Sequence, residues 1–181
     1  ALSLNRALAD PGLGAVTEAQ VRDWVGRGAA RLIEVALQHV VPHHGQDPQK
    51  HAVEARLLAA FMERYQDSVC EASTVYLGVA EFVAAARNAG IRLACVTNKP
   101  YRPAVALLEA LNLLDAFELV IGGDTLAHKK PHPEPLLHCL RHFEVTAAQA
   151  LMVGDSRNDV DAAKAAGVKS LALPYGYNHG E

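Results

Sequence analysis

The chain has 181 residues, of which 50% are hydrophobic and 20% charged, and its net charge at pH 7 is −3. This length and apolar content allow one globular domain or two modest ones, and they exclude extended disorder. The small negative charge argues against a nucleic-acid partner, because proteins that bind nucleic acids usually carry a basic surface. No apolar run reaches the ~18 residues of a membrane span, and no signal-peptide core opens the chain. The composition therefore predicts a cytoplasmic protein without nucleic-acid or membrane partners.

The first 70 residues are typical of a small helical module. Ala-rich amphipathic segments predict helices near residues 2–9, 18–25, 28–40 and 48–67. Asp47 is the expected N-cap of the last helix, and Pro48 is its expected first residue. His43 and His44 precede this helix in a loop and lack a third ligand at zinc spacing, so we expect both at the surface.

From about residue 70 onward, helices alternate with short apolar strands. Helices are expected over residues 79–88, 103–111, 133–142 and 159–166. Strands are expected over residues 91–96, 118–121, 150–153 and 169–173. Continuous apolar strands that alternate with helices of about ten residues are typical of a parallel sheet covered on both faces. The predicted fold class is therefore α/β, with a Rossmann-like parallel sheet and a helical module.

Polar residues follow the predicted strands, at the edge where open α/β sheets bind ligands. Thr97 and Asn98 follow the first strand, where a hydroxyl, an amide and the N–H groups of a helix start could hold an anion. A simple helix cap explains the same two residues. Lys129 and Lys130 follow the second strand and precede Pro131, which restricts the backbone before it. A lysine held in this way can project its charge toward a phosphate, although a basic surface turn is the alternative.

Asp155 and Asp159 follow the third strand and lie four residues apart, so they could share one face. Two carboxylates ~4 Å apart repel by roughly 4 kcal/mol at an effective dielectric constant of about 20. A hard divalent cation with oxygen ligands would offset this repulsion. The alternative is that Asp155 and Ser156 cap the next helix while Asp159 favours its positive end. Together, the three strand ends suit a phosphoryl group held by donors and a lysine beside Mg²⁺.

Three segments resemble the motifs of a known family. VTNKP, GGDTLAHKKPHPEPLL and ALMVGDSRNDVDAAKAAG resemble, in that order, the second, third and fourth motifs of the haloacid dehalogenase superfamily. LALPYGYNHGE and WVGRGAARLIEVAL are similar to segments of bacterial phosphoglycolate phosphatases. The resemblance implies a Rossmann-like core with an inserted α-helical cap domain. Residues 1–9 would begin the core or a linker helix, residues 10–70 would form the cap, and residues 71–181 would form the core.

The resemblance also implies roles for the residues at the strand ends. Thr97 and Asn98 would bind the phosphate, and Lys130 would be the catalytic lysine of the third motif. Asp155 would be a Mg²⁺ ligand. Asp159 would be a second acidic residue that contacts the metal directly or through water.

The first motif of the family is absent from the strands predicted here. That motif is a strand ending in Asp-x-Asp-Gly-Thr, which supplies the nucleophile and the general acid/base. In the family it lies between the strands that end here at Val153 and Val96. Without it the sheet would divide into two pairs with unpaired apolar edges, which invite aggregation. We therefore expect the natural polypeptide to extend upstream of Ala1 and to carry the nucleophile there.

The resemblance implies a Mg²⁺-dependent phosphatase that acts on a small phosphorylated metabolite through an aspartyl-phosphate intermediate. Its favoured substrate is 2-phosphoglycolate. Arg27, between two glycines of the cap, could bind the carboxylate of this substrate, although a solvated arginine in a helix turn is the alternative. A sugar-phosphate mutase or another sugar-phosphate phosphatase is a second possibility, and an inactive phosphate-binding module is a third. The sequence leaves both a monomer and a homodimer open.

Overall fold

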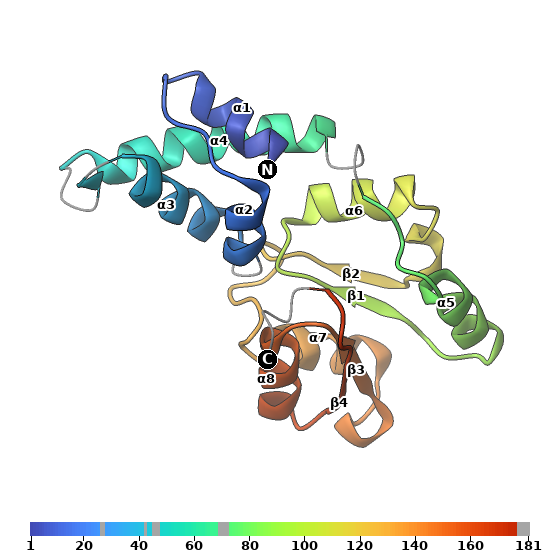
Figure 1. Cartoon of the computed structure of the whole chain (residues 1–181). Coiled ribbons are helices and arrows are strands. Elements are labelled where there is room, and N and C mark those ends of the chain that lie inside the picture. The colour runs from blue at the N-terminus through green and yellow to red at the C-terminus, as the bar shows by residue number, and fades with distance from the viewer. Residues whose placement is uncertain (26–27, 42, 45–47, 69–72, 177–181) are drawn as a thin grey trace. The chain divides into compact units, whose positions relative to one another are not determined.

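The structure is a computed structural model that describes residues 1–25, 28–41, 43–44, 48–68 and 73–176 (Figure 1). The chain divides into two compact units, residues 1–71 and residues 72–181. Arg27 and Asp47 lie outside the described residues. The expected assignment of residues 10–70 to a cap stays a prediction. In the described part of the chain, no helix combines the length and the apolar character that crossing a bilayer requires.

The elements follow the predicted order and types. The first unit contains the helices α1 (Leu2–Ala9), α2 (Glu18–Trp24), α3 (Ala29–Val40) and α4 (Lys50–Ser68). The helices of the second unit are α5 (Val79–Asn88), α6 (Tyr101–Ala110), α7 (Glu134–Phe143) and α8 (Arg157–Ala166), with single 3-10 turns at η2 (Leu114–Ala116) and η3 (Ala147–Gln149). Its strands are β1 (Ala94–Val96), β2 (Leu119–Ile121), β3 (Leu151–Gly154) and β4 (Lys169–Ala172). One expected helix start is wrong, because α4 begins at Lys50 and Pro48 lies before it.

The core of the first unit is formed by the apolar faces of α1, α3 and α4. Leu4 and Leu8 of α1 lie four residues apart, as do Ile33 and Leu37 of α3, so each pair projects from one helix face. All four side chains are almost completely buried, and they pack in one cluster with Phe61 of α4. Burial of each such side chain contributes roughly 1.5–3 kcal/mol.

His44 contradicts the expectation of a surface residue. Only 3% of it is exposed, and its Nε2 lies 3.1 Å from Oε1 of Glu54 on α4. Burial acts to raise the pKa of Glu54, but hydrogen bonds from His44 and His51 outweigh this effect and lower it. A buried imidazole needs such a polar partner. The partner is ten residues away in sequence, and no local pattern indicates it.

The strands of the second unit form two separate parallel pairs rather than one continuous sheet. β1 pairs with β2, with Val96 opposite Ile121 at the carboxyl ends. β3 pairs with β4 in the same orientation. This is the pairing expected for such a sheet without its central strand. Leu151 of β3 and Leu171 of β4 are more than half exposed.

Helices connect the strands within each pair and cover the sheets. α6 lies between β1 and β2 in sequence, and α8 lies between β3 and β4. Gly167 directly follows α8 as its cap, and its φ of 72° turns the chain toward β4. Leu136 of α7 packs against Ala162 and Ala163 of α8 in a second buried cluster. The resulting arrangement brings the loops after β1, β2 and β3 within contact of one another.

Candidate active site

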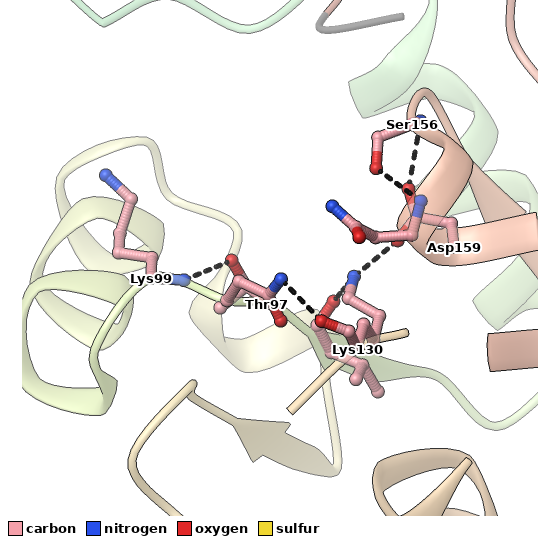
Figure 2. Close-up of polar contacts among 8 residues, drawn as sticks. Thr97, Lys99, Lys130, Ser156 and Asp159 are labelled. Carbon is pink, nitrogen blue, oxygen red and sulfur yellow. Dashed lines mark hydrogen bonds and ion pairs between the residues drawn. The ribbon is translucent and has the colours of Figure 1, made fainter. Parts of the chain in front are cut away.

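Thr97 and Asn98 directly follow β1. The Thr97 N–H donates to the Ile121 carbonyl at 2.9 Å, which extends the pairing with β2 by one residue. The Thr97 Oγ1 accepts from the Lys99 N–H at 3.1 Å, so the hydroxyl stabilises the turn toward α6 (Figure 2). Asn98 Nδ2 donates to the Lys130 carbonyl at 2.9 Å and so joins the loops after β1 and β2. The structure therefore contains both a local turn contact and a bridge between two strand ends.

Lys130, in the loop after β2, contacts the end of β1 and the start of α8. Its Nζ donates to Asp159 Oδ1 at 2.6 Å and also to the Val96 carbonyl at the end of β1. The side chains of Lys130 and Asp159 are only 9% and 7% exposed, so this ion pair is shielded from water. Such a pair needs further hydrogen bonds to offset the cost of removing both charges from water. Lys129, the other lysine considered for this role, is half-buried.

Asp159 connects Lys130 to the start of α8. Ser156 is the N-cap of this helix, and its Oγ accepts from the Asn158 N–H at 3.1 Å. The Ser156 N–H donates in return to Asp159 Oδ2 at 3.1 Å, which completes a capping box (Figure 2). Both carboxylate oxygens of Asp159 thus accept hydrogen bonds from the chain itself. This geometry makes Asp159 a positioning residue for Lys130, and its expected metal contact stays a prediction.

Two glycines allow the backbone to approach the acidic pair closely. A Cβ on Gly154 would overlap the Asp159 side chain, and a Cβ on Gly176 would overlap the Asp155 carboxylate. Gly176 also has a φ of 99°, which favours glycine. Asp155 is half-buried, directly after β3. Its carboxylate thus lies between the end of β3 and the segment that follows β4.

A second pair of glycines, Gly122 and Gly123, follows β2 and packs against the loop after β1. The Gly123 N–H donates to the Lys99 carbonyl at 2.8 Å. Asp124 Oδ1 accepts from the Tyr101 N–H at 2.7 Å and so satisfies a free donor at the start of α6. These two contacts attach the loop after β1 to the loop after β2.

Gly123→Ala is expected to displace Asn98, because the new Cβ would lie 2.9 Å from the Asn98 carbonyl carbon and still closer to its oxygen. Overpacking of this kind lowers the free energy of unfolding by roughly 1–3 kcal/mol. Gly14→Ala is the control, because its Cβ would meet only Val40 at an ordinary 3.9 Å. Urea denaturation of both variants measures the difference. Equal losses in the two variants would contradict the close approach.

Neither cysteine described in this unit is a candidate nucleophile. Burial raises the pKa of the Cys95 thiol on β1, and the charge of Lys130 opposes this only in part. Burial also raises the pKa of Cys139 on α7 to about 11. Both thiols are therefore neutral at pH 7, whereas the nucleophilic form is the thiolate.

The sequence matches the family described as haloacid dehalogenase-like hydrolases over residues 2–173. The chain belongs to this family. It is 42% identical over 181 residues to a phosphoglycolate phosphatase of Colwellia psychrerythraea, and the match covers 100% of this chain and 79% of that protein.

Solved structures of other haloacid dehalogenase-like proteins have the same fold. A predicted phosphoglycolate phosphatase from Haemophilus somnus has a TM-score of 0.87 at 33% identity, with 99% of this chain and 79% of that chain covered. CbbY from Rhodobacter sphaeroides, solved in complex with phosphate, has a TM-score of 0.80 at 27% identity, with 99% and 80% covered. CbbY was also solved in complex with xylulose-1,5-bisphosphate. The family and the fold class expected from the sequence are thus confirmed.

The structure brings together Asn98, Lys130 and Asp159 through direct hydrogen bonds, and it places Thr97 beside Asn98 on the same loop. Sequence reasoning missed that Lys130 and Asp159 pair with each other. No local signal indicates this pair, because 29 residues separate its members. Sequence reasoning also missed Asp124, because its partner Tyr101 lies 23 residues earlier in the chain and no local capping pattern indicates the contact.

Proposed function

We propose that this chain binds and positions the phosphoryl group in a Mg²⁺-dependent phosphatase whose preferred substrate is 2-phosphoglycolate. The observation that carries this proposal is the buried ion pair between Lys130, in the loop after β2, and Asp159, in the first turn of α8. The phosphoglycolate phosphatase that is 42% identical to the whole chain supports the choice of substrate. The small phosphorylated metabolite is the only partner that the proposal requires.

Lys130 would hold the negative charge of the phosphoryl oxygens. Its Nζ is fixed by Asp159 and by the Val96 carbonyl, so little side-chain entropy is lost when a phosphate binds. Fixed cations aimed at developing charge are effective in sites that exclude water. The Thr97 hydroxyl and the Asn98 amide would orient the same group from the end of β1.

The residues at the end of β3 fit a magnesium ion. Asp155 offers a hard carboxylate oxygen, which is the ligand type that Mg²⁺ prefers, and Gly176 leaves room for backbone close to it. When bound, Mg²⁺ would neutralise charge on the phosphoryl oxygens and help to orient them. Asp159 would contact the ion directly or through water while it holds Lys130.

The covalent step needs a nucleophile that the described residues do not place at this site. Among residues 1–25, 28–41, 43–44, 48–68 and 73–176, no Asp-x-Asp pair follows a strand. We propose that an aspartate of the first family motif attacks phosphorus while the bond from phosphorus to the glycolate oxygen breaks, and that water then hydrolyses the aspartyl-phosphate to free phosphate, as the family resemblance implies. Pairing of Arg27 with the substrate carboxylate is likewise a proposal, since Arg27 lies outside the described residues.

A sugar phosphate is the second candidate substrate, because CbbY binds xylulose-1,5-bisphosphate and shares the fold at 27% identity. Kinetics of the full polypeptide encoded by the gene distinguish the candidates. We expect the highest kcat/KM for phosphate release from 2-phosphoglycolate and no release when EDTA removes divalent ions. Release that persists in EDTA would contradict the metal requirement. Formation of an isomer without free phosphate would identify a mutase instead.

A further inference from the structure

Three potential metal ligands gather at the start of α7, in the loop that carries Lys130. They are His128, His132 and Glu134, and one ligand atom of each lies within 4.8 Å of the other two. The Nδ1 of His128 is 2.9 Å from Glu134 Oε2. The two imidazole rings stack with their centroids 4.1 Å apart and their planes at 23°. The cluster contains two nitrogen donors and one carboxylate.

The local chain geometry holds these side chains together without any ion. The His128 N–H donates to Glu134 Oε2 at 2.8 Å, and the Glu134 N–H donates to His132 Nδ1 at 3.2 Å. Pro131 and Pro133 flank His132 and restrict its backbone. The hydrogen bond from the His128 side chain lowers the pKa of Glu134, so this carboxylate is ionised at neutral pH. Both histidines are exposed, and an ion from solvent can reach them.

We propose that His128, His132 and Glu134 form a binding site for one divalent transition-metal ion of the Zn²⁺ class. Two imidazoles and one carboxylate are a ligand set that Zn²⁺ accepts, with a fourth position left for water. Nitrogen donors favour Zn²⁺, Ni²⁺ and Cu²⁺, whereas Mg²⁺ and Ca²⁺ select oxygen donors. The site therefore differs in chemistry from the oxygen site proposed at Asp155. It does not depend on the proposed phosphatase activity.

An ion bound to this cluster would restrict the motion of the segment that carries Lys130. His128 and His132 lie two residues before and two residues after Lys130. An ion bound to both histidines would tie together the two ends of the segment that carries the lysine. The expected result is slower backbone hydrogen exchange in this segment when Zn²⁺ is bound.

A purely structural role for the cluster is the main alternative. Glu134 accepts the His128 N–H and lies in the first turn of α7, where a carboxylate is favoured by the helix dipole. That role uses the Glu134 carboxylate, the backbone of His128 and a ring nitrogen of each histidine as hydrogen-bond partners, but it does not require a metal ion. Zn²⁺ binding by the unsubstituted protein therefore separates the two roles.

The test is a calorimetric titration of the untagged full polypeptide with Zn²⁺ in excess Mg²⁺, which keeps oxygen sites filled. We expect one Zn²⁺ per chain at this site. Affinity should fall at least about tenfold in His128→Gln, His132→Gln and Glu134→Gln, because even outer partners of metal ligands are worth about 10–100-fold. His138→Gln, on α7 but outside the cluster, should bind as the unsubstituted protein does. Absence of binding, or equal affinity in all variants, would overturn the proposal.

Hydrogen exchange locates the ion in the unsubstituted protein and does not rely on the variants folding. Peptides covering residues 126–136 should become protected when Zn²⁺ is added. Protection confined to other histidine-containing segments would overturn the proposal. Circular dichroism of each variant checks that any lost affinity comes from a folded protein.

Discussion

Lys130→Met is expected to remove phosphatase activity and to lower the free energy of unfolding by about 3–5 kcal/mol. The loss of stability arises because Asp159 would remain buried as an unpaired charge, only 5% exposed. The loss of activity, roughly 10²–10³-fold in kcat, arises because the phosphoryl group loses its fixed cation. Steady-state phosphate release and urea denaturation measure the two effects separately.

A double substitution separates the effect of Lys130 on stability from its proposed role in catalysis. Asp159→Asn in the Lys130→Met background removes the unpaired charge and keeps an acceptor for the Ser156 N–H. Most of the lost stability should therefore return, while activity should not. Lys129→Met is the matched control, and we expect it to change stability by no more than about 0.5 kcal/mol. Activity that survives in Lys130→Met but is lost in Lys129→Met would contradict the proposal and assign the catalytic role to Lys129.

The sequence predicts the loops of this site better than it predicts their contacts. Thr97, Lys130 and Asp155 each follow an apolar strand, and the carboxyl ends of parallel strands meet at one edge. Contact between the loops after β1 and β2, which Asn98 and Lys130 make, agrees with this expectation. The separation into two strand pairs follows from the family position of the first motif.

The Lys130–Asp159 ion pair could not be predicted in the same way. Spacing leaves Asp159 open between a metal ligand and a residue of the helix cap, and it does not indicate a lysine 29 residues away. Only the lateral placement of the two sheets decides that its Oδ1 meets Lys130 Nζ. The prediction that His44 lies at the surface is wrong for a similar reason, since the burial of His44 depends on contact with Glu54 of α4. Local patterns determine elements, whereas packing between elements determines side-chain partners.

Asp155→Asn is expected to reduce kcat by roughly 10²–10³-fold and to raise the Mg²⁺ concentration needed for half-maximal activity. An amide keeps the size of the side chain but offers one neutral oxygen to a hard cation instead of a charged carboxylate. Removal of Mg²⁺ from the unsubstituted protein by EDTA should abolish phosphate release, because it removes the ion itself rather than one of its ligands. Phosphate release measured over a series of Mg²⁺ concentrations gives both quantities.

Two other substitutions determine whether this loss is specific to a metal ligand. Asp161→Asn removes a carboxylate of α8 that is 49% exposed and 3.5 Å from Arg157, so it should leave the Mg²⁺ dependence unchanged. Asp159→Asn should lower stability and kcat through Lys130, yet shift the Mg²⁺ dependence less than Asp155→Asn does, because both Asp159 oxygens already accept hydrogen bonds. A larger shift in Asp159→Asn would make Asp159 the principal ligand. An unchanged Mg²⁺ dependence in Asp155→Asn would exclude Asp155 as a metal ligand.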